Sequence, residues 1–174
     1  IDTLADVPWV DEDVEAQKVL AEAHHARGDV RAAIAAIDRA IELMANPDLR
    51  TLRIRAQFLH DSGDFGEARR AFRTVMKRTR MIAAERVMFA RSVIETGGRP
   101  MGTRMLEAMV DEEEPSVAAV FALFEQAGDS PAQRDRLRRA FDELLERSPN
   151  RLSLLTAAAK VEIAAGTPER ARPK

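Results

Sequence analysis

Hydrophobic and polar residues alternate along this chain with the period of an amphipathic helix. From Val14 onward, apolar residues recur at spacings of three and four, which place them on one side of a helix. The clearest run follows Gly28 and consists of Ala33, Ile34, Ile37, Ala40, Ile41 and Met44. Comparable stripes recur as far as Leu145, and β-branched residues never cluster as they do in strands. The pattern predicts a chain built from helices alone.

Glycines divide the helical stretches at nearly regular intervals. Five glycine corners lie 31 to 38 residues apart, at Gly28, Gly63, Gly97, Gly128 and Gly166. A second kind of corner lies midway between them, at residues 45–48, 78–81, 113–116 and 147–150. Two alternating corners in a period of about 34 residues indicate a repeated helical hairpin. Because one hairpin cannot bury its apolar side alone, we expect successive hairpins to stack.

The corners also carry residues that end one helix and begin the next. Glycine readily adopts the left-handed backbone that closes a helix. Asp29 and Asp64 follow two of the glycines and are suitable N-caps, and Glu67 would complete a capping box with Asp64. Pro115 and Pro131 are each expected to open a further helix.

This arrangement resembles the tetratricopeptide repeat (TPR) family, whose helical hairpins of about 34 residues carry apolar, glycine, alanine and proline residues at set positions. In the first unit the matching residues are Leu20, Ala21, Gly28, Asp29, Ala33, Ile37, Ala40 and Leu43. Matches in later units include Ala56, Gly63, Ala68, Phe72, Phe89, Ala90, Gly97, Phe121, Gly128, Phe141 and Pro149. The resemblance implies an all-α, right-handed superhelical solenoid of antiparallel helix pairs, with about 4.5 repeats.

On this basis the chain has two parts. Residues 1–13 are an acidic, extended segment, and residues 14–174 are the TPR-like repeat domain. The predicted units are 14–47, 48–81, 82–114, 115–150 and an incomplete fifth at 151–174. Since the fifth unit lacks most of its second helix and the chain starts at Ile1, we expect the chain to be a segment of a longer protein. Trp9 is a candidate for docking into an apolar groove of this chain or a neighbour, and packing on the first helix is the alternative.

Composition and charge exclude several classes of function. A net charge of −2 gives no overall attraction to nucleic acid or to an anionic membrane. The absence of cysteine excludes disulfides and thiolate chemistry, but it does not decide between the cytoplasm, which we slightly favour, and the periplasm. No apolar run is long enough to cross a bilayer. The Ala- and Arg-rich composition favours a bacterial source.

The resemblance implies that the first helix of each unit lines a concave face. In the first three units its residues are Lys18, Glu22, His25, Arg50, Arg53, Gln57, His60, Val87, Met88 and Arg91. Three arginines make the centre of this face basic, so one interpretation is a groove for an acidic peptide or a C-terminal carboxylate. The alternative is that the arginines are solvated and paired with acidic neighbours such as Glu22 and Glu95.

The pattern departs from the carboxylate clamp of chaperone-binding TPR proteins. Lys18 fits one clamp position, but Glu22, Ile54, Ala84 and Met88 stand at the others. A partner of another kind is therefore expected.

Other candidate chemistry is weaker. His25 and His60 share a register and could face each other, but a metal site needs further ligands, so we interpret them as ordinary histidines of the groove. The arginine-rich stretches 68–80 and 133–141 contain few aromatic residues and are interpreted as solvated helix faces rather than nucleic-acid sites. No catalytic motif, phosphate-binding loop or cofactor site is recognisable.

The sequence therefore predicts a non-catalytic protein–protein interaction scaffold that binds a peptide or helix of a partner, without nucleic acid, membrane insertion or a cofactor. Two alternatives stay open. The chain could be the accessory arm of a larger enzyme such as a transferase, or it could assemble with copies of itself through its open end or its N-terminal segment.

Overall fold

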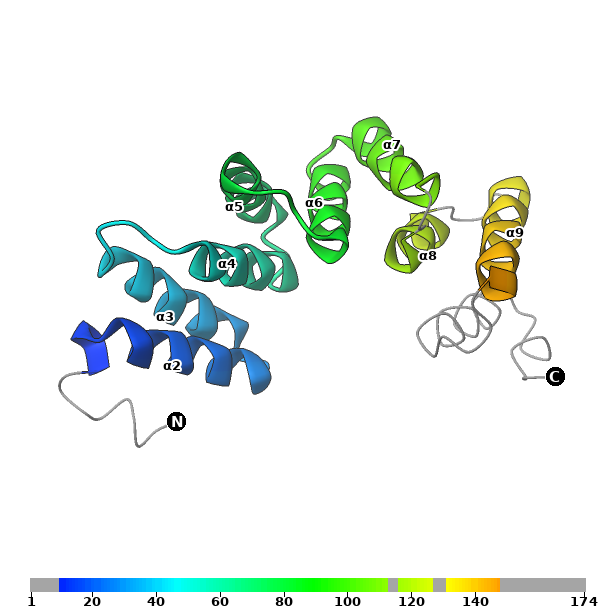
Figure 1. Ribbon diagram of the computed structural model, residues 1–174. Helices are drawn as coiled ribbons and strands as arrows, with labels where there is room; N and C mark the ends of the chain where they lie inside the picture. Colours follow the sequence, from blue (N-terminus) through cyan, green and yellow to red (C-terminus); the bar gives the residue numbers. More distant parts are fainter. Residues whose placement is uncertain (1–9, 113–115, 127–130, 148–174) are drawn as a thin grey trace. The chain divides into compact units, whose positions relative to one another are not determined.

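The computed structural model describes residues 10–112, 116–126 and 131–147. These residues form one short 3₁₀ turn and eight α-helices, and they contain no strand. The elements are η1 (Val10–Glu12), α2 (Val14–Ala26), α3 (Val30–Glu42), α4 (Leu49–Asp61), α5 (Phe65–Arg78), α6 (Ala83–Glu95), α7 (Arg99–Val110), α8 (Val117–Gln126) and α9 (Pro131–Arg147) (Figure 1). The predicted all-α fold class is confirmed.

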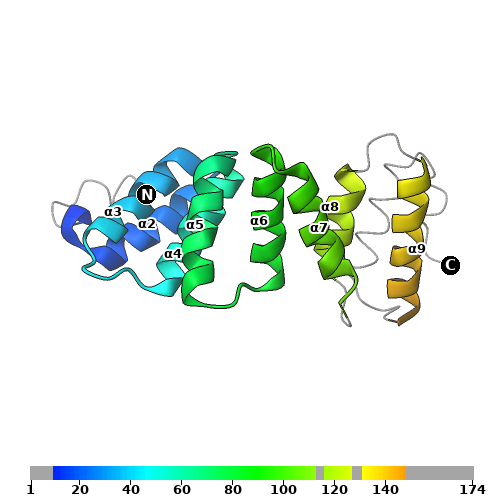
Figure 2. The same ribbon diagram turned by 90° about the horizontal axis from the view of Figure 1, so that it is seen from above.

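The chain divides into two compact units, residues 1–97 and 98–174. The division falls between α6 and α7, at the Gly97-Gly98 pair inside the third predicted hairpin. In unit 1, each helix from α2 to α6 packs on the next one along the chain, and α6 also contacts α4. Figure 2 shows the pairs α2 with α3 and α4 with α5 side by side. Unit 1 thus consists of two complete hairpins and one further helix.

The turns inside the two complete hairpins have the predicted chemistry. Gly28 and Gly63 have φ values of 82° and 81°, in the left-handed region that favours glycine. Asp29 and Asp64 each accept a hydrogen bond from the backbone N–H three residues further on, at 3.3 and 3.1 Å. Both aspartates are therefore N-caps, of α3 and α5 respectively, as predicted.

The predicted capping box is only half formed. Asp64 caps α5, but the side chain of Glu67 pairs with Arg70 in the next helical turn. The reciprocal type of bond occurs instead at α6, where Oε2 of Glu85 accepts from the backbone N–H of Ile82 at 3.0 Å. Nothing in the pattern of polar residues indicated this second bond, because an isoleucine is not a usual N-cap.

Alanine provides much of the buried surface of unit 1. The fully buried alanines are Ala21, Ala33, Ala40, Ala56, Ala68 and Ala90. Because each side chain is a single methyl group, neighbouring helix backbones can approach closely at these points. Larger buried residues fill the remaining space, and among them the rings of Phe72 on α5 and Phe89 on α6 lie 6.4 Å apart. This aromatic contact is part of the packing between α5 and α6.

Unit 2 is built in the same way, with α7 packed on α8 and α8 on α9. Its buried side chains include Leu106, Met109, Val120 and Phe141. α8 begins at Val117 because the Ser116 hydroxyl oxygen accepts a hydrogen bond from the N–H of Ala119 at 3.3 Å. The serine therefore caps the helix that we expected Pro115 to open, and Pro115 itself lies outside the described residues.

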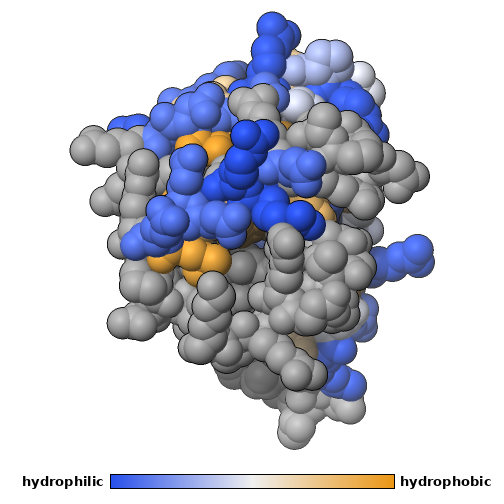
Figure 3. Space-filling model, turned by 90° about the vertical axis from the view of Figure 1, so that its right-hand side faces the viewer, coloured by the Kyte–Doolittle hydropathy of each residue, from blue (hydrophilic) through white to orange (hydrophobic). Residues whose placement is uncertain are grey.

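On the face of the molecule shown in Figure 3, the described residues that are visible are mainly hydrophilic, with small hydrophobic areas between polar side chains. Among the α9 side chains whose placement the structure describes, the exposed ones are Asp135, Arg139, Asp142, Glu143 and Glu146. No helix in the part of the chain that the structure describes combines the length and apolarity needed to span a membrane.

Candidate interaction surface on the first helices of unit 1

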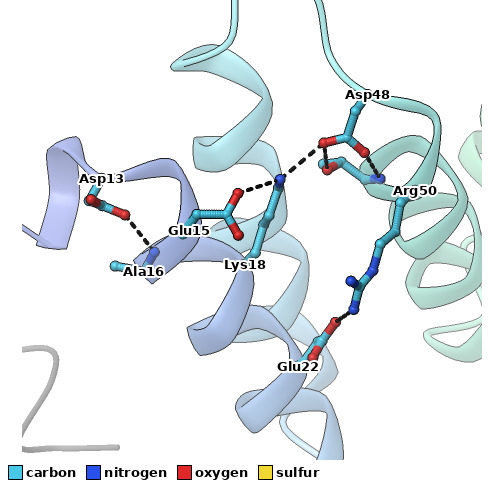
Figure 4. Close-up of polar contacts among 8 residues, drawn as sticks. Asp13, Glu15, Ala16, Lys18, Glu22, Asp48 and Arg50 are labelled. Atoms are coloured by element: carbon cyan, nitrogen blue, oxygen red, sulfur yellow. Dashed lines mark hydrogen bonds and ion pairs between the residues drawn. The ribbon is translucent and has the colours of Figure 1, made fainter.

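Three polar contacts connect α2 with the ends and the first turn of α4. The pairs are Lys18 with Asp48, Glu22 with Arg50 and His25 with Asp61, at 3.0, 3.1 and 2.9 Å between nitrogen and oxygen. Figure 4 shows the first two of them side by side between the two helices. Because the contacts follow one another along α2, these six residues form one surface, which we call the first-helix face.

Asp48 is the most strongly bound acidic residue of this face. As the N-cap of α4, it accepts hydrogen bonds from the backbone N–H of Thr51 at 2.8 Å and from the Thr51 hydroxyl at 2.9 Å. Together with the Lys18 ammonium, these donors lower the pKa of Asp48 from 3.8 to about 2, the backbone bond being the largest cause. Hydrogen bonds to Glu15 and then to Asp48 raise the pKa of Lys18. This end of the face is therefore fully charged at neutral pH.

Arg50 is the most accessible cation of the face. Its side chain is 79% exposed, and Glu22, which it contacts through a single nitrogen, is 50% exposed. An ion pair between two such exposed side chains contributes little to stability. Most of the guanidinium donors of Arg50 therefore remain available to a ligand.

His25 and His60 meet at one carboxylate rather than at a metal. Nε2 of His25 lies 2.9 Å from one oxygen of Asp61, and Nδ1 of His60 lies 3.3 Å from the other. The His25 ring also stacks on Phe58, with centroids 4.3 Å apart. Among the described residues, no group of three or more histidine or acidic side chains is placed to hold a metal ion. The cluster joins α2 to α4 near the C-terminal ends of both helices.

Arg53 belongs to the packing between helices rather than to an open surface. Its Nε lies 2.9 Å from Oε1 of Glu85, and the Glu85 side chain is only 8% exposed. Glu85 therefore has two partners, the guanidinium of Arg53 and the N–H of Ile82. This pair ties α4 to α6, and the charge of Arg53 is largely used inside the protein.

The other residues that the sequence predicts for the groove differ in accessibility. Gln57 is exposed on α4, seven residues after Arg50 and so on the same side of the helix. Met88 and Arg91 on α6 are half-buried, and Val87 is buried in the core, so its side chain offers no surface to a partner. Trp9 and the fifth predicted unit lie outside the described residues.

Sequence reasoning missed three acidic residues that pair with the basic residues predicted for the groove: Asp48, Asp61 and Glu85. Asp48 carries a usable signal, because it precedes an apolar-periodic run by one residue and so matches the N-cap pattern. Asp61 and Glu85 carry none, because their partners His25 and Arg53 lie in another repeat and these pairs depend on how the hairpins stack.

No protein-family model matches this sequence, and the curated proteins yield no match either. Solved structures do match. They include YrrB, described as "a TPR protein with an unusual peptide-binding site", with 16% identity, 92% of this chain and 81% of that chain covered, and a TM-score of 0.56. They also include MamA, with 14% identity, 91% and 85% covered, and a TM-score of 0.60.

A tetratricopeptide repeat protein from Parabacteroides merdae is similar over 96% of this chain and 63% of its own, with 16% identity and a TM-score of 0.66. At such low identity these likenesses concern the fold. The chain has the fold of TPR proteins, and the resemblance expected from its repeats is confirmed at that level.

Proposed function

We propose that this chain is a non-catalytic protein-interaction scaffold and that the first-helix face of unit 1 binds an acidic peptide or helix of a partner protein. The TPR fold supports the general role, and YrrB is a structural neighbour whose description includes a peptide-binding site. The proposal of this particular surface is supported by Lys18, Arg50, His25 and His60 of neighbouring hairpins, each of which contacts an acidic residue there.

The proposal rests on the exposure of Arg50 and on its weak pairing with Glu22. Arg50 is highly exposed and is held by one weak contact with Glu22, so a carboxylate of a partner can replace that contact at little cost. A guanidinium binds a carboxylate through two parallel hydrogen bonds, which adds both strength and orientation. Gln57, two helical turns away on α4, supplies an amide for the backbone of an extended peptide.

Glu22 has a defined role in this proposal. It neutralises Arg50 in the free protein and competes with an incoming carboxylate. Removing its charge should therefore strengthen binding, whereas removing the charge of Arg50 should weaken it. Opposite effects from the two members of one ion pair are not expected from a general loss of stability.

A displayed library of random peptides tests the proposal. We expect the wild-type protein to enrich acidic peptides, which should bind about five- to tenfold more weakly to Arg50→Gln and more tightly to Glu22→Gln. Arg31→Gln serves as the matched control, because Arg31 is exposed on α3, the second helix of the first hairpin, and belongs to neither the first-helix face nor its ion pairs. Arg53 is not a suitable target, since its replacement leaves the buried Glu85 without its cation.

Two results would overturn the proposal. One is a library that yields no enriched peptide with the wild-type protein. The other is a set of enriched peptides whose affinities do not change on Arg50→Gln and Glu22→Gln.

A further inference from the structure

Helix α5 separates its apolar and basic residues onto opposite sides. Its buried residues, Ala68, Ala71, Phe72 and Val75, pack toward α4 and α6. The opposite side is exposed, and the exposed Arg80 follows two residues after the end of the helix. We call this surface the α5 strip; its residues are Arg70, Arg73, Met76, Lys77 and Arg80. On α5 itself, Arg70, Arg73, Met76 and Lys77 lie on one side of the helix at spacings of three and four, and Arg80 follows just beyond the helix end.

The positive charge of this part of the chain stands out against the whole. Residues 65–91 contain eight basic and two acidic residues, whereas the complete chain has a net charge of −2. Both acidic residues are already engaged, Glu67 with Arg70 and Glu85 with Arg53. Neither is therefore available to neutralise the rest of the α5 strip.

Other arginines of the same helix have internal roles, and the contrast is informative. Arg69 donates to the Thr96 hydroxyl, and Arg78 donates to the carbonyl oxygen of Pro47 and the side chain of Asn46. These two residues fasten α5 to its neighbours. By contrast, the side chains of Arg73, Lys77 and Arg80 make no hydrogen bond or ion pair within the part of the chain that the structure describes.

An exposed methionine lies among the basic residues of the α5 strip. Met76 is 50% exposed, Arg73 lies one helical turn before it on the same side of α5, and Lys77 follows it in sequence. Methionine adapts its shape to an apolar partner, and the flanking cations attract carboxylates. The α5 strip therefore combines a small apolar centre with a basic surround.

We propose that the α5 strip is a second docking surface, which binds an acidic amphipathic helix of a partner protein. The complementary helix carries Asp or Glu at spacings of three and four around one apolar residue, which packs on Met76. Charge complementarity selects an acidic partner, and the exposed methionine favours a protein over a nucleic acid. Stacking of bases needs exposed aromatic rings, and the aromatic residues of α5 are not exposed: Phe65 is half-buried and Phe72 is buried. This surface lies on a second helix and is separate from the first-helix face.

The test uses the full chain and a synthetic acidic helix with glutamates at spacings of three and four around a central leucine. Binding is measured by fluorescence anisotropy. We expect Arg73→Glu with Lys77→Glu to weaken binding about tenfold or more, and added salt to weaken wild-type binding progressively. The matched control is Arg27→Glu with Arg31→Glu, which makes the same change in net charge at exposed residues of the first hairpin and should leave affinity within about twofold. A peptide of the same composition with scrambled glutamates should bind more weakly.

Each other outcome would overturn the proposal. Equal losses in the two double variants would show attraction to net charge alone, and loss on Arg50→Gln instead would place the peptide on the first-helix face. A DNA duplex that binds more tightly than the peptide, through Arg73 and Lys77, would make the ligand a nucleic acid. Self-association abolished by Arg73→Glu with Lys77→Glu would make the occupant a second copy. Circular dichroism confirms that each variant remains helical.

Discussion

Asp48 offers the sharpest test of how the first two hairpins are held together. Its carboxylate caps α4 through Thr51 and pairs with Lys18 of α2, so one side chain serves both a helix end and the contact between hairpins (Figure 4). Two substitutions separate the roles. Asn retains an oxygen that can cap the helix but loses the charge, whereas Ala loses both.

The structure gives the expected magnitudes. A pKa lowered from 3.8 to about 2 corresponds to at most about 2 kcal/mol of stabilisation of the charged form. Because 47% of the Asp48 side chain is exposed, solvent screening reduces this to about 1 kcal/mol or less. Loss of an N-cap costs about 1 kcal/mol, and part of this is already contained in the lowered pKa, because the Thr51 N–H is its largest cause. We therefore expect a loss of free energy of unfolding of about 0.5–1 kcal/mol for Asp48→Asn and about 1–2 kcal/mol for Asp48→Ala.

Urea unfolding followed by circular dichroism measures these differences, and pH separates their causes. The pKa of Asp48 is lower in the folded protein than its usual value, so its charge stabilises the fold above pH 3.8. That contribution disappears as the pH falls toward 2. The difference in stability between the wild type and Asp48→Asn should accordingly be constant near neutral pH and vanish at about pH 2. Other carboxylates titrate in both proteins and largely cancel in this difference.

The reasoning fails if the Asn variant is as stable as the wild type at neutral pH. It also fails if the difference between them is the same at about pH 2 as at about pH 6, since a charge that is absent at low pH cannot stabilise the fold there.

Two further matched pairs follow from the structure. Gly63→Ala should destabilise unit 1 by about 1 kcal/mol, because φ is 81° there. Gly66→Ala should stabilise it by about 0.5 kcal/mol, because Gly66 lies within α5 and an added Cβ meets nothing closer than 3.7 Å. Thermal unfolding of the two variants checks these opposite signs. Arg53→Ala should cost about 2 kcal/mol by leaving the buried Glu85 without its cation, whereas Arg50→Ala should cost about 0.5 kcal/mol or less. Equal urea midpoints for these two arginine variants would contradict the assigned roles.

The local chemistry of the hairpins could be predicted from sequence because it depends on residues close together in the chain. A glycine followed by an aspartate, as at Gly28-Asp29 and Gly63-Asp64, specifies a left-handed turn and an N-cap without reference to the rest of the fold. The period of the apolar stripe likewise identifies the buried side of helices such as α3, where Ala33, Ile37 and Ala40 are buried. The capping of α8 by the Ser116 hydroxyl was not predicted, and Pro115, which was expected to open this helix, lies outside the described residues.

The roles of the charged residues could not be predicted in this way. Arg50 and Arg53 lie one turn apart on α4 and are indistinguishable by type, yet one is exposed and the other is paired with a buried carboxylate on α6. The same limit applied to Val87, which helical register assigned to the groove and the packing of α6 buries. In each case the outcome depends on the rotation of a helix against its neighbour, which a stripe of small and apolar residues restricts only loosely.

For this protein, the sequence by itself determined the repeated hairpins, their turns and their buried sides, because these follow from the backbone and from neighbours a few residues away. The tertiary structure alone decided which charges face each other across hairpins and which remain open to a partner. Such pairs join residues about 30 positions apart, as Lys18 with Asp48, and their distances are fixed only once the apolar sides have packed.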